Sequence, residues 1–245
     1  MAPLPNYFAD EIAQTYDRDV AWNFTPEVIS PTVAHLKQLA DGGPCLEFAI
    51  GTGRVALPLR AVDVKVDGIE LSADMIIQLR QKPGGGDIEV VQGDMTSVDV
   101  GKTYALVFLV FNTIMNLTSQ KGQVECFRNA ARHLKAGGKF VVEVMVPDLR
   151  LYPPSAKGVV SDISPSHLGV NTYGIAEQKL VSHHVNIYED GHARYNTLPF
   201  RYVWPSELDL MAQIAGMNLV SRHEDWIGTP FGDNSSQHVS VWEKI

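Results

Sequence analysis

The sequence has few cysteines, no cluster of basic residues and no long hydrophobic run. Its 245 residues include two cysteines, Cys45 and Cys126, which excludes a disulfide scaffold and a four-cysteine metal site. The longest apolar run, residues 104–111, is far shorter than a membrane-spanning helix. Residues 1–10 lack the basic and apolar regions of a secretory signal. We therefore expect a cytoplasmic protein that binds no metal and no membrane.

The charge is negative and unevenly distributed. The chain has 28 acidic and 20 basic residues, a formal net charge of −8. Residues 1–100 contain 15 acidic and 7 basic side chains, whereas residues 101–245 contain 13 of each, so the whole acidic excess lies in the first part. Proteins that bind a phosphate backbone concentrate lysine and arginine on one surface. The sequence therefore predicts no nucleic-acid partner.

Up to residue 147, short apolar runs alternate with helical patterns. Hydrophobic residues form 45% of the chain and charged residues 20%, a composition that builds a folded core. Residues 44–50, 64–70, 88–91, 104–111 and 139–146 are predicted as strands. Helical patterns cover residues 7–20, the segment after Pro26, a segment capped by Ser72, and one that begins at Thr118 or Ser119 and ends at Gly137-Gly138. This alternation predicts an α/β fold with a parallel, doubly wound sheet.

After Pro147 the pattern changes. Alternating residues dominate from 159 to 204, and Asp190-Gly191 is typical of a hairpin turn between two strands. Pro205 then begins a helical segment, and residues 219–226 and 238–243 are predicted as the last two strands. The chain is thus predicted to form a seven-stranded sheet with an antiparallel insertion after strand five.

A glycine-rich turn follows the first predicted strand. Gly51-Thr52-Gly53 with Ala56 matches the dinucleotide-binding pattern G-x-G-x-x-A, and Glu70 lies 19 residues after Gly51. Glycines let the backbone approach a ligand, and a carboxylate at the end of the second strand can accept hydrogen bonds from two ribose hydroxyls. On this observation alone, two interpretations are open. The chain is an NAD(P)-dependent oxidoreductase, or the turn binds no ligand at all.

Three features favour a different ligand. Glu47 lies inside the first strand, where a carboxylate would repel a pyrophosphate but attract a cation. Asp94 closes the third strand, where it can accept the exocyclic amine of an adenine, and Met95 beside it can pack on the ring. The acidic excess lies in the same part of the chain. A positively charged nucleoside fits these features better than a dinucleotide does.

Four segments in order carry a resemblance to a known family. Residues 46–54, 68–72, 92–95 and 134–138 resemble the motifs of class I S-adenosylmethionine-dependent methyltransferases, and together they span about residues 45–146. The resemblance implies a Rossmann-like doubly wound sheet of seven strands, mostly parallel with a reversed last strand. It divides the chain into N-terminal cap helices and a cofactor-binding core (1–147), an antiparallel lid or substrate insertion (148–204), and a C-terminal helix with the last two strands (205–245).

The resemblance also implies a cofactor, S-adenosylmethionine, and places residues around it. The turn at Gly51 would lie against the methionine part, Glu70 would hold the ribose hydroxyls, and Asp94 would meet the adenine edge. Arg54 would pair with the methionine carboxylate, or is simply a surface residue at a helix start. Ala49 stands where the family often has glycine. The predicted cofactor site comprises Tyr16, Trp22, Ala49, Gly51, Gly53, Arg54, Glu70, Leu71, Met75, Asp94, Met95, Val110 and Phe111.

The acceptor is predicted to be a small molecule methylated on nitrogen or oxygen. The motif of nucleic-acid amino-methyltransferases is absent after the fourth strand, where Phe111-Asn112-Thr113 stands, and so is the aspartate of the metal-dependent catechol type. The insertion resembles the lid of small-molecule methyltransferases acting on sugars, amino acids or secondary metabolites. Its aromatic residues either line a cavity or form a small core of their own: Tyr173, Tyr188, Tyr195, Tyr202 and Trp204.

No side chain stands out as a general base. His183 lies on an apolar strand face, and His184 points to the opposite face, so the two cannot chelate one metal. Asn112 and Asn116 follow the fourth strand, where they could touch an acceptor. We take His183 and Asn112 as catalytic candidates. The lack of a clear base keeps a non-catalytic cofactor-binding scaffold open beside the oxidoreductase alternative, and the sequence leaves a homo-oligomer open.

Overall fold

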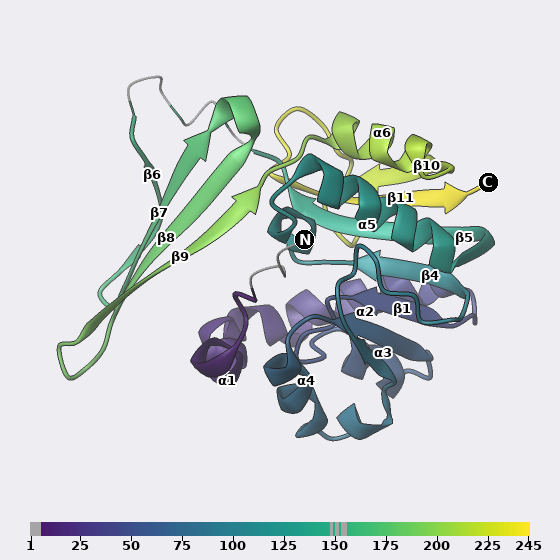
Figure 1. The fold of residues 1–245 in the computed structure, drawn as a ribbon, viewed down its shortest axis with the longest axis horizontal. Coiled ribbons are helices and arrows are strands. Elements are labelled where there is room, and N and C mark those ends of the chain that lie inside the picture. Colours follow the sequence, from purple (N-terminus) through teal and green to yellow (C-terminus); the bar gives the residue numbers. More distant parts are fainter. Residues whose placement is uncertain (1–5, 148, 150–151, 153–155) are drawn as a thin grey trace.

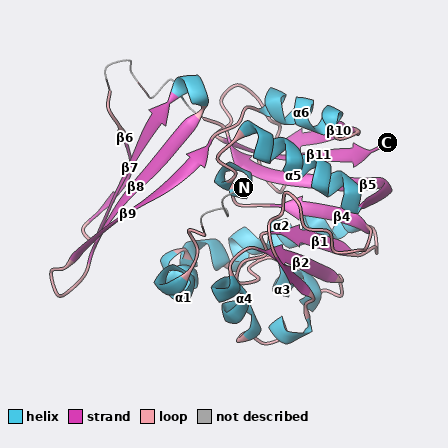
Figure 2. Cartoon of the chain, viewed as in Figure 1, coloured by secondary structure: helices cyan, strands magenta, loops and turns pink. Residues whose placement is uncertain are grey.

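The computed structural model describes residues 6–147, 149, 152 and 156–245 of the chain. It contains a seven-stranded sheet covered by helices and a separate four-stranded sheet that projects from it (Figures 1 and 2). Within the described residues, no helix has both the length and the apolar character that a membrane crossing requires.

The strand order of the large sheet is β10-β11-β5-β4-β1-β2-β3. Strands β1 to β5 pair in parallel, whereas β11 runs antiparallel to both β5 and β10. The predicted Rossmann-like sheet with a reversed last strand is therefore confirmed. Its strands are β1 (Cys45–Phe48), β2 (Val66–Glu70), β3 (Val90–Gln92), β4 (Tyr104–Leu109), β5 (Leu134–Met145), β10 (Met217–His223) and β11 (Gln237–Lys244).

Helices cover both faces of this sheet, and the sheet separates the core into two apolar clusters. One cluster lies under α5 (Gln120–His133) and α6 (Pro205–Ile214), with Phe127, Phe140 and Trp242 at its centre. The other lies under α2 (Pro26–Ala40), α3 (Ala56–Ala61) and α4 (Ala73–Arg80). Strand β4 contributes alternate residues to both clusters, as expected of a central parallel strand buried on two faces. Helix α1 (Asp10–Asp19) lies beside α4, outside these layers.

One predicted helix end is wrong. Helix α5 ends at His133, not at Gly137-Gly138, because Leu134 already pairs with Tyr104 as the first residue of β5. The register then shifts, and Lys139 pairs with Leu106. The two glycines lie in this irregular part of the strand, where Gly137 has a φ of 71°.

The insertion forms an antiparallel sheet of four strands in the order β6-β7-β8-β9, which we call the lid sheet. Its strands are β6 (Val159–Ser164), β7 (His167–Gly174), β8 (Lys179–Ile187) and β9 (Ala193–Arg201). The Asp190-Gly191 turn joins β8 to β9, as predicted. The predicted first residue of the insertion, 148, lies outside the described residues, so the division at 147/148 and 204/205 stays a prediction.

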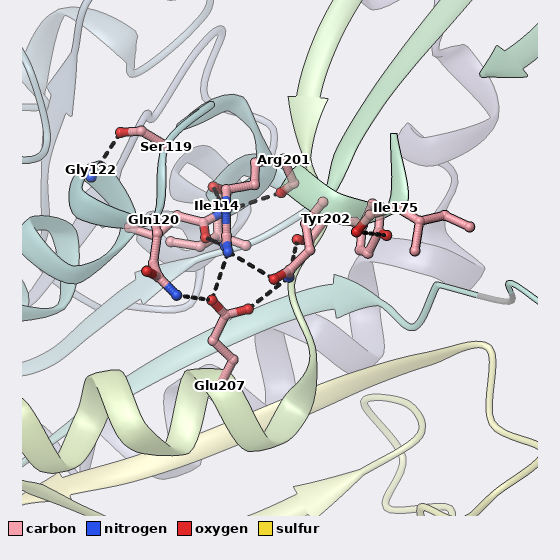
Figure 3. A network of polar contacts seen from close by, with 10 residues as sticks. Ile114, Ser119, Gln120, Gly122, Ile175, Arg201, Tyr202 and Glu207 are labelled. Atoms are coloured by element: carbon pink, nitrogen blue, oxygen red, sulfur yellow. Dashed lines mark hydrogen bonds and ion pairs between the residues drawn. The ribbon is translucent and has the colours of Figure 1, made fainter. Parts of the chain in front are cut away.

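A buried ion pair fastens the lid sheet to the core. Arg201, at the end of β9, donates to Glu207 Oε1 on α6 (2.7 Å), to Gln123 Oε1 on α5 and to Gln178 Oε1 before β8 (Figure 3). The side chains of Arg201 and Glu207 are 7% and 15% exposed. Gln120 and Gln178 also donate to the Glu207 carboxylate. This network holds the end of β9, at the base of the lid sheet, against both α5 and α6.

We expect Arg201→Met to destabilise the protein by about 3–5 kcal/mol, because removing one partner of a buried pair leaves the other charge unpaired. The free energy of unfolding in urea measures the loss. The control is Arg128→Met, which breaks an exposed pair with Glu125 and should change stability by at most about 1 kcal/mol. Equal losses in the two variants would contradict an anchoring role for Arg201.

Candidate active site

A pocket lies at the carboxyl ends of β1, β2 and β3, the edge where ligands bind in parallel α/β sheets. About 910 Å³ of empty space lies within the pocket and its mouth, open solvent included. Residues from five parts of the chain line it: the N-terminal segment with α1, the turn after β1, the ends of β2 and β3, the first turn of α4, and the segment 113–118 after β4.

The turn after β1 has an unusual backbone. Ala49, Gly51 and Gly53 all have positive φ, at 51°, 56° and 81°. Gly53 needs glycine for a second reason, since a Cβ there would lie 2.4 Å from Leu79 Cδ1. Ala49 adopts the left-handed conformation at a cost of about 1 kcal/mol. The turn therefore brings bare backbone to the pocket wall.

Glu70 links this turn to the start of α4. Its Oε2 accepts from the Gly51 N–H and its Oε1 from the Ser72 N–H, both at 2.8 Å. Burial raises the pKa of Glu70, although these two hydrogen bonds oppose the shift. A carboxylate has about four acceptor positions, so two remain for a ligand. Ser72 in turn caps α4 by accepting from the Met75 N–H, as predicted.

Glu47 is a second buried carboxyl at this edge. It lies inside β1 and is 3% exposed. Burial raises its pKa to about 8, against the opposing attraction of Arg54. Its Oε2 has no hydrogen-bond partner among the described residues. The site thus holds two acidic groups whose charge the protein only partly compensates, an arrangement that suits a positively charged ligand.

Helix α1 covers one side of the pocket and is tied to the glycine turn. Asp17 accepts from the Thr52 hydroxyl at 2.6 Å and forms an ion pair with Lys82, which also donates to the Thr52 carbonyl. Tyr16 faces the pocket with its ring edge-on to Phe8. Burial raises the pKa of Tyr16. The phenol therefore stays protonated and can donate a hydrogen bond.

Three predicted cofactor residues form a separate cluster. The Arg54 guanidinium lies 5.1 Å from the centre of the Phe111 ring, and Trp22 meets the same ring edge-on. Arg54 also donates to the Asn23 carbonyl. Trp22 is 64% exposed. None of the three lines the pocket.

The structure brings most predicted cofactor residues together. The pocket is lined by Tyr16, Ala49, Gly51, Glu70, Leu71, Met75, Asp94 and Met95, whereas Trp22, Gly53, Arg54, Val110 and Phe111 lie outside its lining. Sequence reasoning missed Asn6, Tyr7, Phe8, Ile69, Gly93, Thr113, Leu117 and Thr118. The strand ends Ile69 and Gly93 adjoin predicted residues and could have been included. The N-terminal segment carried no signal, because it reaches the site through long-range contacts such as Ser72 Oγ to the Phe8 carbonyl.

Neither catalytic candidate lines this pocket. The Asn112 side-chain oxygen accepts from the Met145 N–H at 2.6 Å, which joins the end of β4 to β5. His183 lies in the lid sheet, between the Tyr195 hydroxyl and the Thr172 hydroxyl. Their catalytic roles stay predictions, and these contacts give both side chains a structural role. Asn116, by contrast, does line the pocket.

Comparisons with known proteins identify the family. A model of the methyltransferase domain matches residues 45–138. The solved structure of the CcbJ methyltransferase from Streptomyces caelestis is 33% identical, covers 96% of each chain and superposes with a TM-score of 0.85. The chain belongs to the S-adenosylmethionine-dependent methyltransferases. This decides between the alternatives that the sequence left open: the glycine turn belongs to a methyltransferase and not to an oxidoreductase.

Other relatives are more distant. The cypemycin N-terminal methyltransferase of a Streptomyces species is 24% identical over 209 residues, 83% of this chain and 84% of the relative. The S-adenosylmethionine-bound CalS10, an amino pentose methyltransferase from Micromonospora echinaspora, is 17% identical, covers 98% of this chain and 99% of its own and has a TM-score of 0.72. That likeness shows the fold.

The pocket of this methyltransferase suits its cofactor, S-adenosylmethionine. A sulfonium nucleoside needs acidic groups near its positive charges and apolar walls beside its adenine. The pocket lining contains the buried Glu70 and the apolar side chains of Leu71, Met75 and Met95, and the buried Glu47 lies in the strand that leads into it. The positive φ of Ala49 also explains why the family's usual glycine fits there, since glycine adopts that conformation without strain.

Glu47→Gln should change how stability depends on pH. A carboxyl that ionises near pH 8 when folded but near 4.5 when unfolded binds more protons in the folded state between these values, so its contribution to stability is lost as pH rises through that window. We expect the variant to match the wild type near pH 5 and to exceed it above pH 8, by an amount on the order of a few kcal/mol. Urea unfolding of the unliganded protein at both pH values measures this. A constant difference would contradict the buried, uncompensated state of Glu47.

Proposed function

We propose that this methyltransferase transfers a methyl group to the nitrogen of a small polar amine. The proposal rests on the pocket, which is lined by the glycine turn and the buried Glu70 carboxyl, and on the buried Glu47 in the strand that leads into this turn. The acceptor type is supported by the curated relatives. One is the cypemycin enzyme, and a second is a dTDP-3-amino-3,6-dideoxy-α-D-glucopyranose N,N-dimethyltransferase from Streptomyces fradiae, 28% identical over 56% of this chain and 54% of its own.

In this proposal the lining residues hold the cofactor along its length. The two free acceptor positions of Glu70 bind the ribose hydroxyls, and the Asp94 carboxylate meets the adenine amine. Leu71, Met75 and Met95 pack against the adenine. The backbone at Ala49 and Gly51 borders the methionine part, where Glu47 compensates positive charge. Five further predicted residues lie outside this lining and support the glycine turn and the end of β4: Gly53, Arg54, Trp22, Val110 and Phe111.

The chemistry asks the protein chiefly for alignment. Bound S-adenosylmethionine supplies a methyl group already activated on a sulfonium. The chain must place the acceptor nitrogen in line, exclude water and leave the nitrogen lone pair free of a proton. Thr113, Asn116 and Thr118 line the pocket on the side of the lid sheet and can hydrogen-bond an acceptor. Tyr16 closes the opposite side.

The cofactor assignment predicts a ranking of binding defects. Glu70→Gln should weaken binding of S-adenosylhomocysteine roughly 10- to 100-fold, because charge-assisted hydrogen bonds to the ribose are lost. Asp94→Asn should weaken it less, because Asp94 is assigned a single hydrogen bond from the adenine amine and the asparagine side-chain oxygen can still accept it. Isothermal titration calorimetry measures the dissociation constants.

The control for this series is Asp87→Asn, which removes an exposed carboxylate far from the pocket lining and should leave affinity unchanged. Thermal unfolding of each variant checks that the fold persists, since Glu70 also accepts two backbone N–H groups. An unchanged dissociation constant in a folded Glu70→Gln variant would refute the ribose role.

The nitrogen acceptor is tested with matched pairs. Amino sugars, amino acids and short peptides with a free amino terminus are incubated with S-adenosylmethionine beside their N-acetylated counterparts, and mass spectrometry follows the gain of one CH₂ unit. We expect products only from the free amines. Methylation of both members of a pair would place the acceptor atom on oxygen. A cytoplasmic location and self-association into a homo-oligomer also stay predictions, which cell fractionation and analytical ultracentrifugation test.

A further inference from the structure

Four side chains of the lid sheet form one continuous hydrogen-bonded chain. Asp162 Oδ2 lies 2.6 Å from His167 Nδ1, His167 Nε2 lies 3.0 Å from His184 Nδ1, and His184 Nε2 lies 2.9 Å from Ser182 Oγ. The two imidazole rings are stacked with an interplanar angle of 25°. Every nitrogen of both rings is engaged, and a proton can pass from one end of the chain to the other.

These four hydrogen-bonded side chains lie on the face of the lid sheet that is turned to the core. Side chains alternate along a strand, so Leu180, Ser182 and His184 share one face of β8. Leu180 belongs to the main apolar cluster of the core. At the other end of this face, Arg194 on β9 stands opposite Asn186 and forms an ion pair with Glu11 of α1. Ser182 and His184 lie between these two anchors.

The two ends of the chain differ in exposure. Ser182 is buried, His167 is 24% exposed at its side chain, and Asp162 is 61% exposed. The chain therefore begins at a buried hydroxyl on the inward face and ends at a carboxylate in solvent. A purely structural network would gain nothing from this gradient.

Two buried acceptors without donors flank the inward end. Asn171 pairs in register with Ser182, and Asn196 pairs with His184. The side-chain oxygens of both asparagines are buried and have no hydrogen-bond partner among the described residues. Neither oxygen competes with Ser182 or His184 for a hydrogen-bond donor, and leaving both unpaired is a cost that the fold bears at this end of the hydrogen-bonded chain.

We propose that the chain from Ser182 through His184 and His167 to Asp162 takes up the proton that an amine acceptor must lose and carries it to solvent. This rests on the proposed function, because an amine is protonated near neutral pH and its lone pair is free only after that proton leaves. Ser182 is the group that touches the acceptor. The other three residues act through it.

The proton balance is closed. The ammonium gives its proton to Ser182 Oγ, whose own hydroxyl proton moves to His184 Nε2. The Nδ1 proton of His184 passes to His167 Nε2, and the Nδ1 proton of His167 passes to Asp162 and then to water. The freed lone pair forms the new N–C bond while the S–C bond breaks and leaves its electron pair on sulfur. No oxidant or reductant is needed.

The surrounding charges favour a neutral resting chain. Burial, with His167 and His183 nearby, lowers the pKa of His184, and Asp162 opposes this shift. Beside these, Arg194 of β9 and its partner Glu11 of α1 are the charged groups facing this surface from the neighbouring elements. At acid pH a proton occupies His184 Nε2, the atom that must receive a proton from Ser182, so the hydrogen-bonded chain can no longer take up the acceptor's proton.

Nuclear magnetic resonance of histidine nitrogens tests the chain in the protein without acceptor. We expect His184 to be neutral at pH 7 with its proton on Nδ1, and we expect His167→Gln to change its titration. Ser182→Ala should shift the His184 Nε2 resonance. If His184 titrates as an isolated histidine, unaffected by His167→Gln, the proposal is overturned.

The rate of methylation, measured with the pooled free amines of the acceptor assay, tests the role of the four hydrogen-bonded side chains. We expect the wild type to lose rate at acid pH. His184→Gln should lower kcat about 10²-fold, abolish that loss and leave S-adenosylhomocysteine affinity unchanged. His192→Gln, in the exposed β8–β9 turn, is the control and should behave as the wild type. A wild-type rate and pH profile in His184→Gln, or a larger loss in His183→Gln, would overturn the chain. If the wild type fails to bind S-adenosylhomocysteine, the result contradicts the proposed function and not the hydrogen-bonded chain.

Discussion

Two buried acidic groups at the carboxyl ends of β1 and β2 are the constraint on which the rest of the site depends. Glu47 lies just before a turn whose backbone is forced into positive φ, and Glu70 accepts from the Gly51 N–H of that turn. Burial raises the pKa of both carboxyls. The protein compensates them only in part, through backbone N–H groups at Glu70 and the nearby Arg54 at Glu47. The folded chain therefore holds an electrostatic deficit that a cationic nucleoside removes.

The elements around the pocket are held by polar contacts that cross long stretches of sequence. Asp17 joins α1 to Thr52 and Lys82, and Ser72 joins α4 to the carbonyl of Phe8. The lid sheet is fixed at its base by Arg201 and near its tip by Arg194. Such fastening from several sides leaves a chamber whose walls come from parts of the chain that are far apart in sequence.

The sequence predicted the sheet well, because five apolar runs separated by helical patterns leave few alternatives to a parallel, doubly wound arrangement. It also placed Glu70 and Asp94 correctly at one edge, since strand ends meet there. It failed where neighbours decide the outcome. The end of α5 depends on Leu134 pairing with Tyr104, which no local pattern reveals. Asn112 was chosen for its position, but its side chain binds a strand backbone. Alternation separated His183 from His184, yet which face meets the core depends on how the sheet packs.

The central claim is that cofactor binding ionises the buried Glu47, which is protonated in the unliganded protein at pH 7. Calorimetry of S-adenosylmethionine binding at pH 7, repeated in buffers of different ionisation enthalpy, measures the protons exchanged. Because Glu47 ionises only near pH 8 in the unliganded protein, its pairing with a positively charged ligand should release close to one proton in the wild type and none in Glu47→Gln. The same heat in every buffer would show that Glu47 does not respond to the ligand and would contradict the account.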